Sequence, residues 1–167
     1  RYPLVTGVQT CALPISAPSS AVSLGVDVGG SFTLSTFIDP ASSFADGLSV
    51  FTVGDSANGL SVRLLDRGAV EVRGLADGAI TRLSTPVGVL SSGSWHQLAV
   101  VVDNGSATIV VDGRSVASGQ LSLGLGSVLF GSSDGSVGVV NHIAVFTRAR
   151  SEEHTSELQS RVDISYA

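Results

Sequence analysis

The central part of this chain is most informative in what it lacks. Between residues 19 and 149 there is no lysine, cysteine, methionine or tyrosine, and Glu71 is the only glutamate. Without cysteine, no disulfide framework can hold this part together. The chain carries a net charge of −5, so no basic surface for nucleic acid is expected. No run approaches the ~18 apolar residues of a membrane helix, so membrane insertion is not expected either.

Residues that favour helices are also scarce, whereas those typical of strands and turns abound. Serine, glycine, valine and leucine dominate the central part. Valine favours the pleated geometry of a sheet, and serine and glycine favour tight turns. A segment of this length makes one domain with enough apolar material for a core. The composition therefore predicts a single all-β domain.

Both ends of the chain resemble translated sequencing adapter rather than protein. Residues 5–15 read VTGVQTCALPI, and residues 150–160 read RSEEHTSELQS, which resembles the same adapter in reverse complement. We therefore predict that 1–16 and 150–167 are adapter-derived and non-native, and that 17–149 is the domain. The alternative, natural tails with accidental similarity, would need two separate matches.

Two segments predict strands on the basis of alternation alone. In residues 31–39, Phe32, Leu34, Thr36 and Ile38 share one face, and Pro40 ends the strand because it has no amide donor. Residues 60–65 and 69–73 predict a hairpin with a three-residue loop, in which Gly68 adopts a left-handed conformation. That register pairs Leu64 with Val70, Val62 with Val72, and Arg63 with Glu71.

The strongest local signal is a second hairpin, formed by residues 96–103 and 106–112. Asn104-Gly105 favours a type I′ turn because both residues tolerate positive φ. The register then builds one apolar face from three pairs: Val102 with Ala107, Val100 with Ile109, and Leu98 with Val111. Further strands are expected at 114–117, 127–130 and 139–146. This spacing of strands and turns predicts an antiparallel two-sheet β-sandwich.

Three motifs, in order, resemble the laminin G-like members of the concanavalin A-like lectin and glucanase superfamily. They are Phe32-Thr33-Leu34-Ser35 with Phe37 and Pro40, then Trp95-His96-Gln97-Leu98-Ala99 through Val110-Val111-Asp112-Gly113, then residues 138–146 with Arg148-Ala149. The resemblance covers most of the central segment and implies a jelly-roll fold. It does not identify the function, because this fold hosts lectins, adhesion modules, accessory domains and glycosidases.

The sequence does not support catalysis. Retaining glucanases of the superfamily carry a Glu-x-Asp-x-x-Glu strand for nucleophile and acid roles, and Glu71 alone cannot supply it. Residues 131–135 match the Gly-x-Ser-x-Gly pattern, but the serine nucleophile of that motif needs a helix after it. We therefore predict a turn there and no enzyme activity.

A calcium site is the one cofactor that the resemblance allows. Asn141 stands where family members have an aspartate that holds calcium, and Asp39, Asp55 and Asp134 could contribute from loops. Asparagine offers a neutral oxygen, so the affinity should be lowered. The alternative is that Asp39 only forms a turn.

Loop residues supply the candidate ligand contacts. The loops 53–59, 84–94 and 131–136 are expected to share one rim, with ligand-binding residues Asp55, Asn58, Ser133 and Asp134. Trp95 could stack on a sugar, although its position favours packing.

The resulting prediction is a non-catalytic module that binds carbohydrate or protein. We expect it to belong to a larger extracellular or cell-surface protein with flanking domains. The alternative is a ligand-free accessory domain that packs against a neighbouring glycoside hydrolase or sialidase. A glycan-binding measurement discriminates between the two.

Overall fold

The protein is described from a computed structural model of the 167-residue chain. The structure describes residues 8–11, 15–16, 21–42, 46–132, 135 and 138–150. No helix in these ranges is long and apolar enough to cross a membrane.

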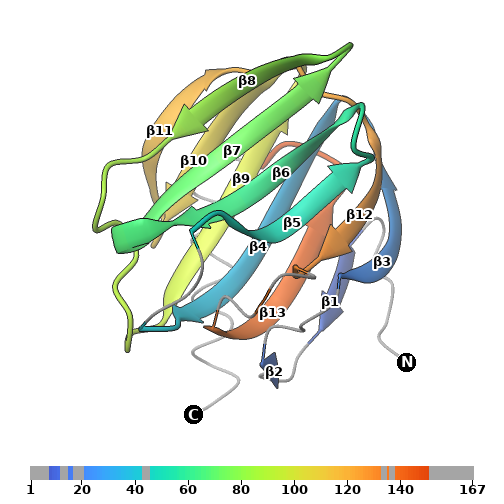
Figure 1. The fold of residues 1–167 in the computed structure, drawn as a ribbon. Helices are drawn as coiled ribbons and strands as arrows, with labels where there is room; N and C mark the ends of the chain where they lie inside the picture. The colour runs from blue at the N-terminus through green and yellow to red at the C-terminus, as the bar shows by residue number, and fades with distance from the viewer. Residues whose placement is uncertain are drawn as a thin grey trace.

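Two antiparallel sheets are stacked face to face, as Figure 1 shows. Sheet A has the order β1 (Val8–Cys11), β13 (Gly138–Phe146), β4 (Ser31–Pro40), β9 (His96–Asp103), β10 (Ser106–Val111) and β11 (Arg114–Gln120), and β2 (Ile15–Ser16) also pairs with β13. Sheet B has the order β3 (Val22–Val28), β12 (Gly126–Phe130), β5 (Leu48–Gly54), β6 (Gly59–Leu65), β7 (Ala69–Ala76) and β8 (Ala79–Ser84). The predicted two-sheet β-sandwich is confirmed.

Both predicted hairpins have the expected register. In β6 and β7, Val62 lies opposite Val72 and Arg63 opposite Glu71. They are joined by a short 3₁₀ turn, η1 (Asp66–Gly68), in which Gly68 has φ +72°. In β9 and β10 the three predicted apolar pairs are formed, and the six side chains are buried in one core between the sheets. The core therefore forms where local alternation and turn chemistry place it.

Strand β4 is buried on both faces. Phe32, Leu34 and Ile38 point into the core, but Thr33 and Ser35 on the other face are buried as well. The Thr33 hydroxyl donates to the carbonyl of Arg148 (3.0 Å) and accepts from the amide of Arg150 (3.0 Å). The chain that follows β13 thus covers part of the outer face of sheet A.

Five strands were not predicted from the sequence: β1, β2, β3, β5 and β8. In β5 the extra residue Val50 forms a bulge, so that Val50 and Phe51 are both buried and the alternation is broken. Strands β3 and β8 lie at the two edges of sheet B, where few apolar residues are needed.

Strands β1 and β2 come from the segment predicted to be adapter-derived. Their backbones pair along β13, with Val8 opposite Phe146 and Val139 opposite Ser16. This pairing does not test the origin of the segment, because any extended chain can hydrogen-bond to an open sheet edge. The adapter origin stays a prediction.

Candidate functional site

One rim of the sandwich is built from three chain segments. They are the end of β4 with the following residues, the turn η1, and the loop between β8 and β9. The last two are joined by backbone hydrogen bonds, from Gly88 N to Arg67 O (2.8 Å) and from Leu90 N to Gly68 O (3.0 Å). A side chain at position 68 would collide with the carbonyl of Leu90, so only glycine allows this close approach.

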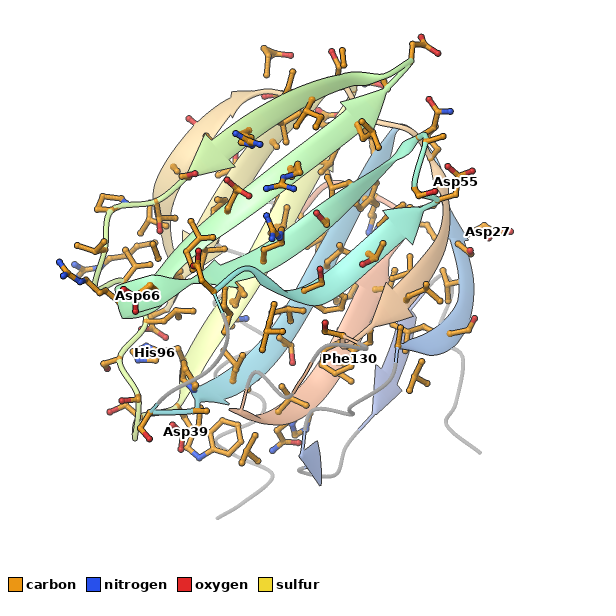
Figure 2. The ribbon with its side chains drawn as sticks, viewed as in Figure 1. Asp27, Asp39, Asp55, Asp66, His96 and Phe130 are labelled. Atoms are coloured by element: carbon orange, nitrogen blue, oxygen red, sulfur yellow. The ribbon has the colours of Figure 1, made fainter. Side chains whose placement is uncertain are left out.

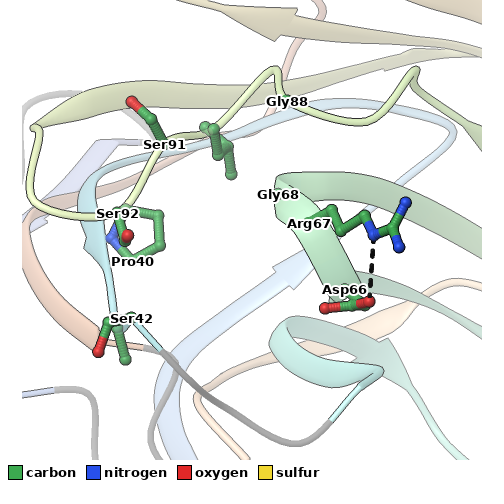
Figure 3. A pocket seen from close by; sticks show the side chains of 10 residues that line it. Pro40, Ser42, Asp66, Arg67, Gly68, Gly88, Ser91 and Ser92 are labelled. Carbon is green, nitrogen blue, oxygen red and sulfur yellow. Dashed lines mark ion pairs between the residues drawn. The ribbon is translucent and has the colours of Figure 1, made fainter.

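A cavity of about 520 Å³ opens between these segments, as Figure 3 shows. It is lined by residues 40–42, Asp66–Gly68, and residues 88 and 90–92, and we call it the rim pocket. Asp66 and Arg67 form an ion pair at 3.8 Å, and both are largely exposed to solvent. Leu90 is buried, whereas Ser42, Ser91 and Ser92 offer hydroxyls. The volume of this cavity is typical of a small-ligand pocket, and its polar groups can orient a ligand.

The loop over this pocket is held by a hydrogen-bonded chain of three residues. His96 Nε2 accepts from the Ser91 amide (3.0 Å) and lies 2.9 Å from the Ser91 hydroxyl. His96 Nδ1 lies 2.8 Å from an oxygen of Asp112. Because Nε2 accepts the amide proton, Nδ1 carries the ring proton and donates it to Asp112.

These three hydrogen-bonded residues are connected as in a Ser-His-Asp triad, but they lack the geometry needed for catalysis. In a serine hydrolase, backbone amides near the nucleophile point at the developing oxyanion. Here the Ser91 amide points at the base itself and occupies its lone pair. This cluster was not predicted from the sequence, since its members come from a loop, a strand and the turn that follows β10. We interpret it as a clamp that fixes the pocket wall.

Trp95 corrects one expectation. A packing role was favoured, but its side chain is 48 % exposed. It lies in the same loop, between the pocket residue Ser92 and the clamp residue His96. Trp95 does not line the pocket, but an exposed aromatic ring is suited to stacking on a sugar.

The predicted rim was wrong in one respect. Loop 53–59 lies at the opposite end of β5 and β6 from the turn η1, as Figure 2 shows for Asp55 and Asp66. Ser133 and Asp134 lie outside the described residues. Of the three predicted loops, 84–94 lines the pocket, and Gly131 of the third loop follows β12 at the same end of sheet B as η1.

Asp55 and Asn58 lie together and form their own turn. An oxygen of Asp55 accepts from the amides of Ala57 and Asn58, both at 2.8 Å. These hydrogen bonds stabilise the charged form, which lowers the pKa of the Asp55 carboxyl. Asn58 accepts from the Asp77 amide at 3.1 Å. Both side chains are engaged in holding loops, and their role as ligand contacts stays a prediction.

Asp39 and Asn141, the predicted calcium ligands, lie on neighbouring strands. Asp39 pairs with Val139, and Asn141 pairs with Phe37, so the two side chains share one face of sheet A. Among the described residues, Asp39 Oδ1 is buried without a hydrogen-bond partner, which suits a cation. The pair supplies only part of a shell of six to eight oxygens. The part of the chain that the structure describes holds no cluster of three His, Cys, Asp or Glu residues for a metal.

The fold is similar to several solved structures. The carbohydrate-binding module CBM40 of the Ruminococcus gnavus IT-sialidase, bound to α2,3-sialyllactose, is 14 % identical with a TM-score of 0.71, over 90 % of this chain and 97 % of that one. The leech intramolecular trans-sialidase is 16 % identical with a TM-score of 0.71, over 92 % of this chain and 28 % of that one.

A toxin domain has a similar fold. The botulinum neurotoxin serotype D binding domain is 10 % identical with a TM-score of 0.67, over 90 % of this chain and 45 % of that one. This chain therefore spans less than half of the toxin domain and of the trans-sialidase. At these identities the likeness concerns the fold alone.

Sequence comparison gives the family. No curated protein matches the chain significantly. A laminin G-type family model, described as the concanavalin A-like lectin/glucanases superfamily, matches residues 15–156. Because this match spans most of the chain, the protein belongs to the concanavalin A-like lectin/glucanases superfamily.

Proposed function

We propose that the protein is a non-catalytic binding module that holds a carbohydrate or protein ligand in the rim pocket. The observation that carries this proposal is the pocket itself, with serine hydroxyls, the Asp66–Arg67 ion pair and a buried Leu90. Hydroxyls and a charged pair can donate to and accept from sugar hydroxyls, and an apolar floor accommodates the C–H face of a ring.

Residue chemistry favours binding over catalysis. Glycoside hydrolysis needs two carboxyl groups roughly 5 to 10 Å apart. Within the described residues the only glutamate, Glu71, hydrogen-bonds to two arginines on the outer face of sheet B, so those residues do not hold the two-glutamate strand of the superfamily's retaining glucanases. The Ser91 amide occupies the base of the only Ser-His-Asp chain seen in the same residues. Two proteins of similar fold, a carbohydrate-binding module and a toxin binding domain, agree with a binding role.

The cellular setting follows from the proposed role. A module of this family that binds glycans or proteins would work outside the cell or at its surface. It would form one part of a longer protein with flanking domains.

A ligand-free accessory role is the second candidate. It is favoured by the leech trans-sialidase, in which the similar region makes up 28 % of the chain. In that case the pocket rim would contact a neighbouring domain rather than a ligand.

Glycan-array binding of the purified chain separates the two candidates. We expect binding to selected glycans, and we expect Arg67→Asn and Ser92→Phe to weaken it, because one removes a pocket donor and the other fills the cavity. Asparagine tolerates the positive φ of Arg67 (59°), so the turn is kept. Arg114→Asn, at an exposed site on β11, is the control. Silence across the array, or binding that the pocket variants leave unchanged, would contradict the proposal.

A further inference from the structure

The outer face of sheet B carries an arginine cluster remote from the rim pocket. Val62 and Val72 are buried on the inner face, so their neighbours Arg63, Glu71 and Arg73 point outward. Arg82 on β8 lies in register with Arg73. The three strands β6, β7 and β8 lie side by side in Figure 1. We call these four residues, Arg63, Glu71, Arg73 and Arg82, the arginine face.

One carboxylate serves all three guanidinium groups. Glu71 Oε1 accepts from Arg63 Nη1 and from Arg73 Nη2, both at 3.1 Å. Within the described ranges, the cation nearest to Glu71 Oε2 is Arg82 Nε at 3.9 Å, which is within ion-pair range but too long for a hydrogen bond. Glu71 thus neutralises one of three positive charges.

The remaining charge is concentrated on Arg73 and Arg82. Arg63 is anchored by a further hydrogen bond from its Nε to the carbonyl of Gly47 (2.9 Å). In contrast, Arg73 Nε is buried with no hydrogen-bond partner among the described residues. Arg82 is 56 % exposed, and no hydrogen bond of its guanidinium is seen in the same residues. Each guanidinium has five N–H donors, so the exposed Arg82 in particular has donors that a ligand can reach.

This arrangement costs stability, which argues for a role in binding. Arg73 and Arg82 are directly opposite each other on antiparallel strands, and like charges in that position are destabilising. A third of the nine arginines of an acidic chain lie in this one cluster. An anionic ligand would relieve the repulsion and use the spare donors.

The surroundings indicate what kind of anion fits. Ser61 lies in register with Arg73 on one side and supplies a hydroxyl. The next cross-strand pair on the outer face is Leu75 with Ile80, of which Ile80 is 53 % exposed. Two guanidinium groups, a serine hydroxyl and a pair of apolar side chains therefore lie close together on this face, within two residues of Arg73 along β7.

We propose that the arginine face is a second binding site, for a carboxylate-bearing saccharide. The planar guanidinium of Arg82 can bind a carboxylate through two parallel hydrogen bonds, and Arg73 adds positive charge beside it. The sugar hydroxyls meet Ser61, and the apolar face of the ring covers Leu75 and Ile80. This site is remote from the rim pocket, so either of the two proposals can be wrong without affecting the other.

Isothermal titration with defined trisaccharides tests the assignment on the full chain. We expect 3′-sialyllactose or trigalacturonate to bind at least about tenfold more tightly than neutral lactose, because charge-assisted hydrogen bonds are the strong ones. The double variant Arg73→Gln/Arg82→Gln should lose this preference. The control Arg114→Gln, with the same change of side chain at an exposed site of sheet A, should keep it. If the double variant does not fold, Arg82→Gln alone is measured, because that side chain is the most exposed of the three.

Several outcomes would overturn the second site. These are equal binding of lactose and the acidic sugars, no binding of either acidic sugar at millimolar concentration, and unchanged binding in the arginine variants. Equal binding of lactose 3′-sulfate would overturn the carboxylate assignment. Loss of the acidic sugar in Arg67→Asn, but not in the arginine variants, would place the ligand in the rim pocket instead and leave only the proposed function standing.

Discussion

Glu71 is the residue on which the charge balance of sheet B depends. Its side chain is only 10 % exposed and holds Arg63 and Arg73 at 3.1 Å. The sequence predicted its pairing with Arg63, since register follows from the turn, but Arg73 and Arg82 were not associated with it. Their positions on β7 and β8 place them around the same carboxylate.

Glu71→Gln should destabilise the fold by about 1–3 kcal/mol. The substitution keeps the shape but leaves three guanidinium groups without a counter-charge. The loss stays below that of a fully buried pair because water screens the partly exposed arginines. Urea unfolding at low and high salt measures it, and the loss should shrink at high salt. Asp66→Asn, in the exposed ion pair with Arg67, should change stability far less. An equal effect of the two substitutions would contradict this account.

His142 makes stability depend on pH. It lies in β13 with φ +51°, and burial lowers the pKa of its imidazole below the ordinary value of 6.5. The unfolded chain then binds the proton at a higher pH than the folded one. The free energy of unfolding should therefore fall as pH drops below about 6.5, until the lowered native pKa is passed.

The variant His142→Asn tests this dependence. Asparagine tolerates the left-handed backbone and does not titrate. Urea midpoints at about pH 7.5 and about pH 5 should differ more in the wild type than in the variant. Equal differences would show that His142 is not the titrating group.

At the scale of elements, the β9–β10 hairpin is the best-determined unit. Its turn residues Asn104 and Gly105 have φ values of 47° and 86°, as a type I′ turn requires. The turn and the alternation on both sides agree on one register. Strand β5 shows the opposite case, because its bulge at Val50 gives no local signal.

Gly105→Ala should destabilise the protein by about 1–2 kcal/mol, because alanine at positive φ is strained. Its methyl group would also lie 3.3 Å from the carbonyl of Leu121. Thermal unfolding measures the effect. Gly29→Ala is the matched control, since a methyl there would meet nothing within 4 Å. Equal melting temperatures for the two variants would contradict the assigned turn.

At the scale of the whole molecule, strands β4 and β13 bring together the predicted calcium ligands. We propose that Asp39 and Asn141 contribute to a weak calcium site. If the dissociation constant is about 1 mM, as in extracellular modules, saturating calcium should raise the melting temperature by a few degrees. Asp39→Asn should abolish the shift, and Asp55→Asn at the opposite rim should not. No shift of the wild type at millimolar calcium would remove the site.

The candidate site shows the limit of local information. The sequence predicted the loop 84–94, the turn at Asp66–Gly68 and the end of the strand at Pro40, but it did not predict that these three segments meet. Loop 53–59 was placed at the same rim, although strands β5 and β6 carry it to the other end. Which loops meet depends on strand order and direction, and these are set by contacts between distant segments.

The sequence by itself determined the all-β class, the two hairpins and the apolar face of the core. These follow from turn residues and alternation within about ten residues, where each side chain's face is set by its neighbours along the strand. Only the tertiary structure decided the bulge of β5, the rim pocket and the arginine face. Each of these joins strands or loops that local patterns do not connect, because their pairing is chosen by the packing of the whole sandwich.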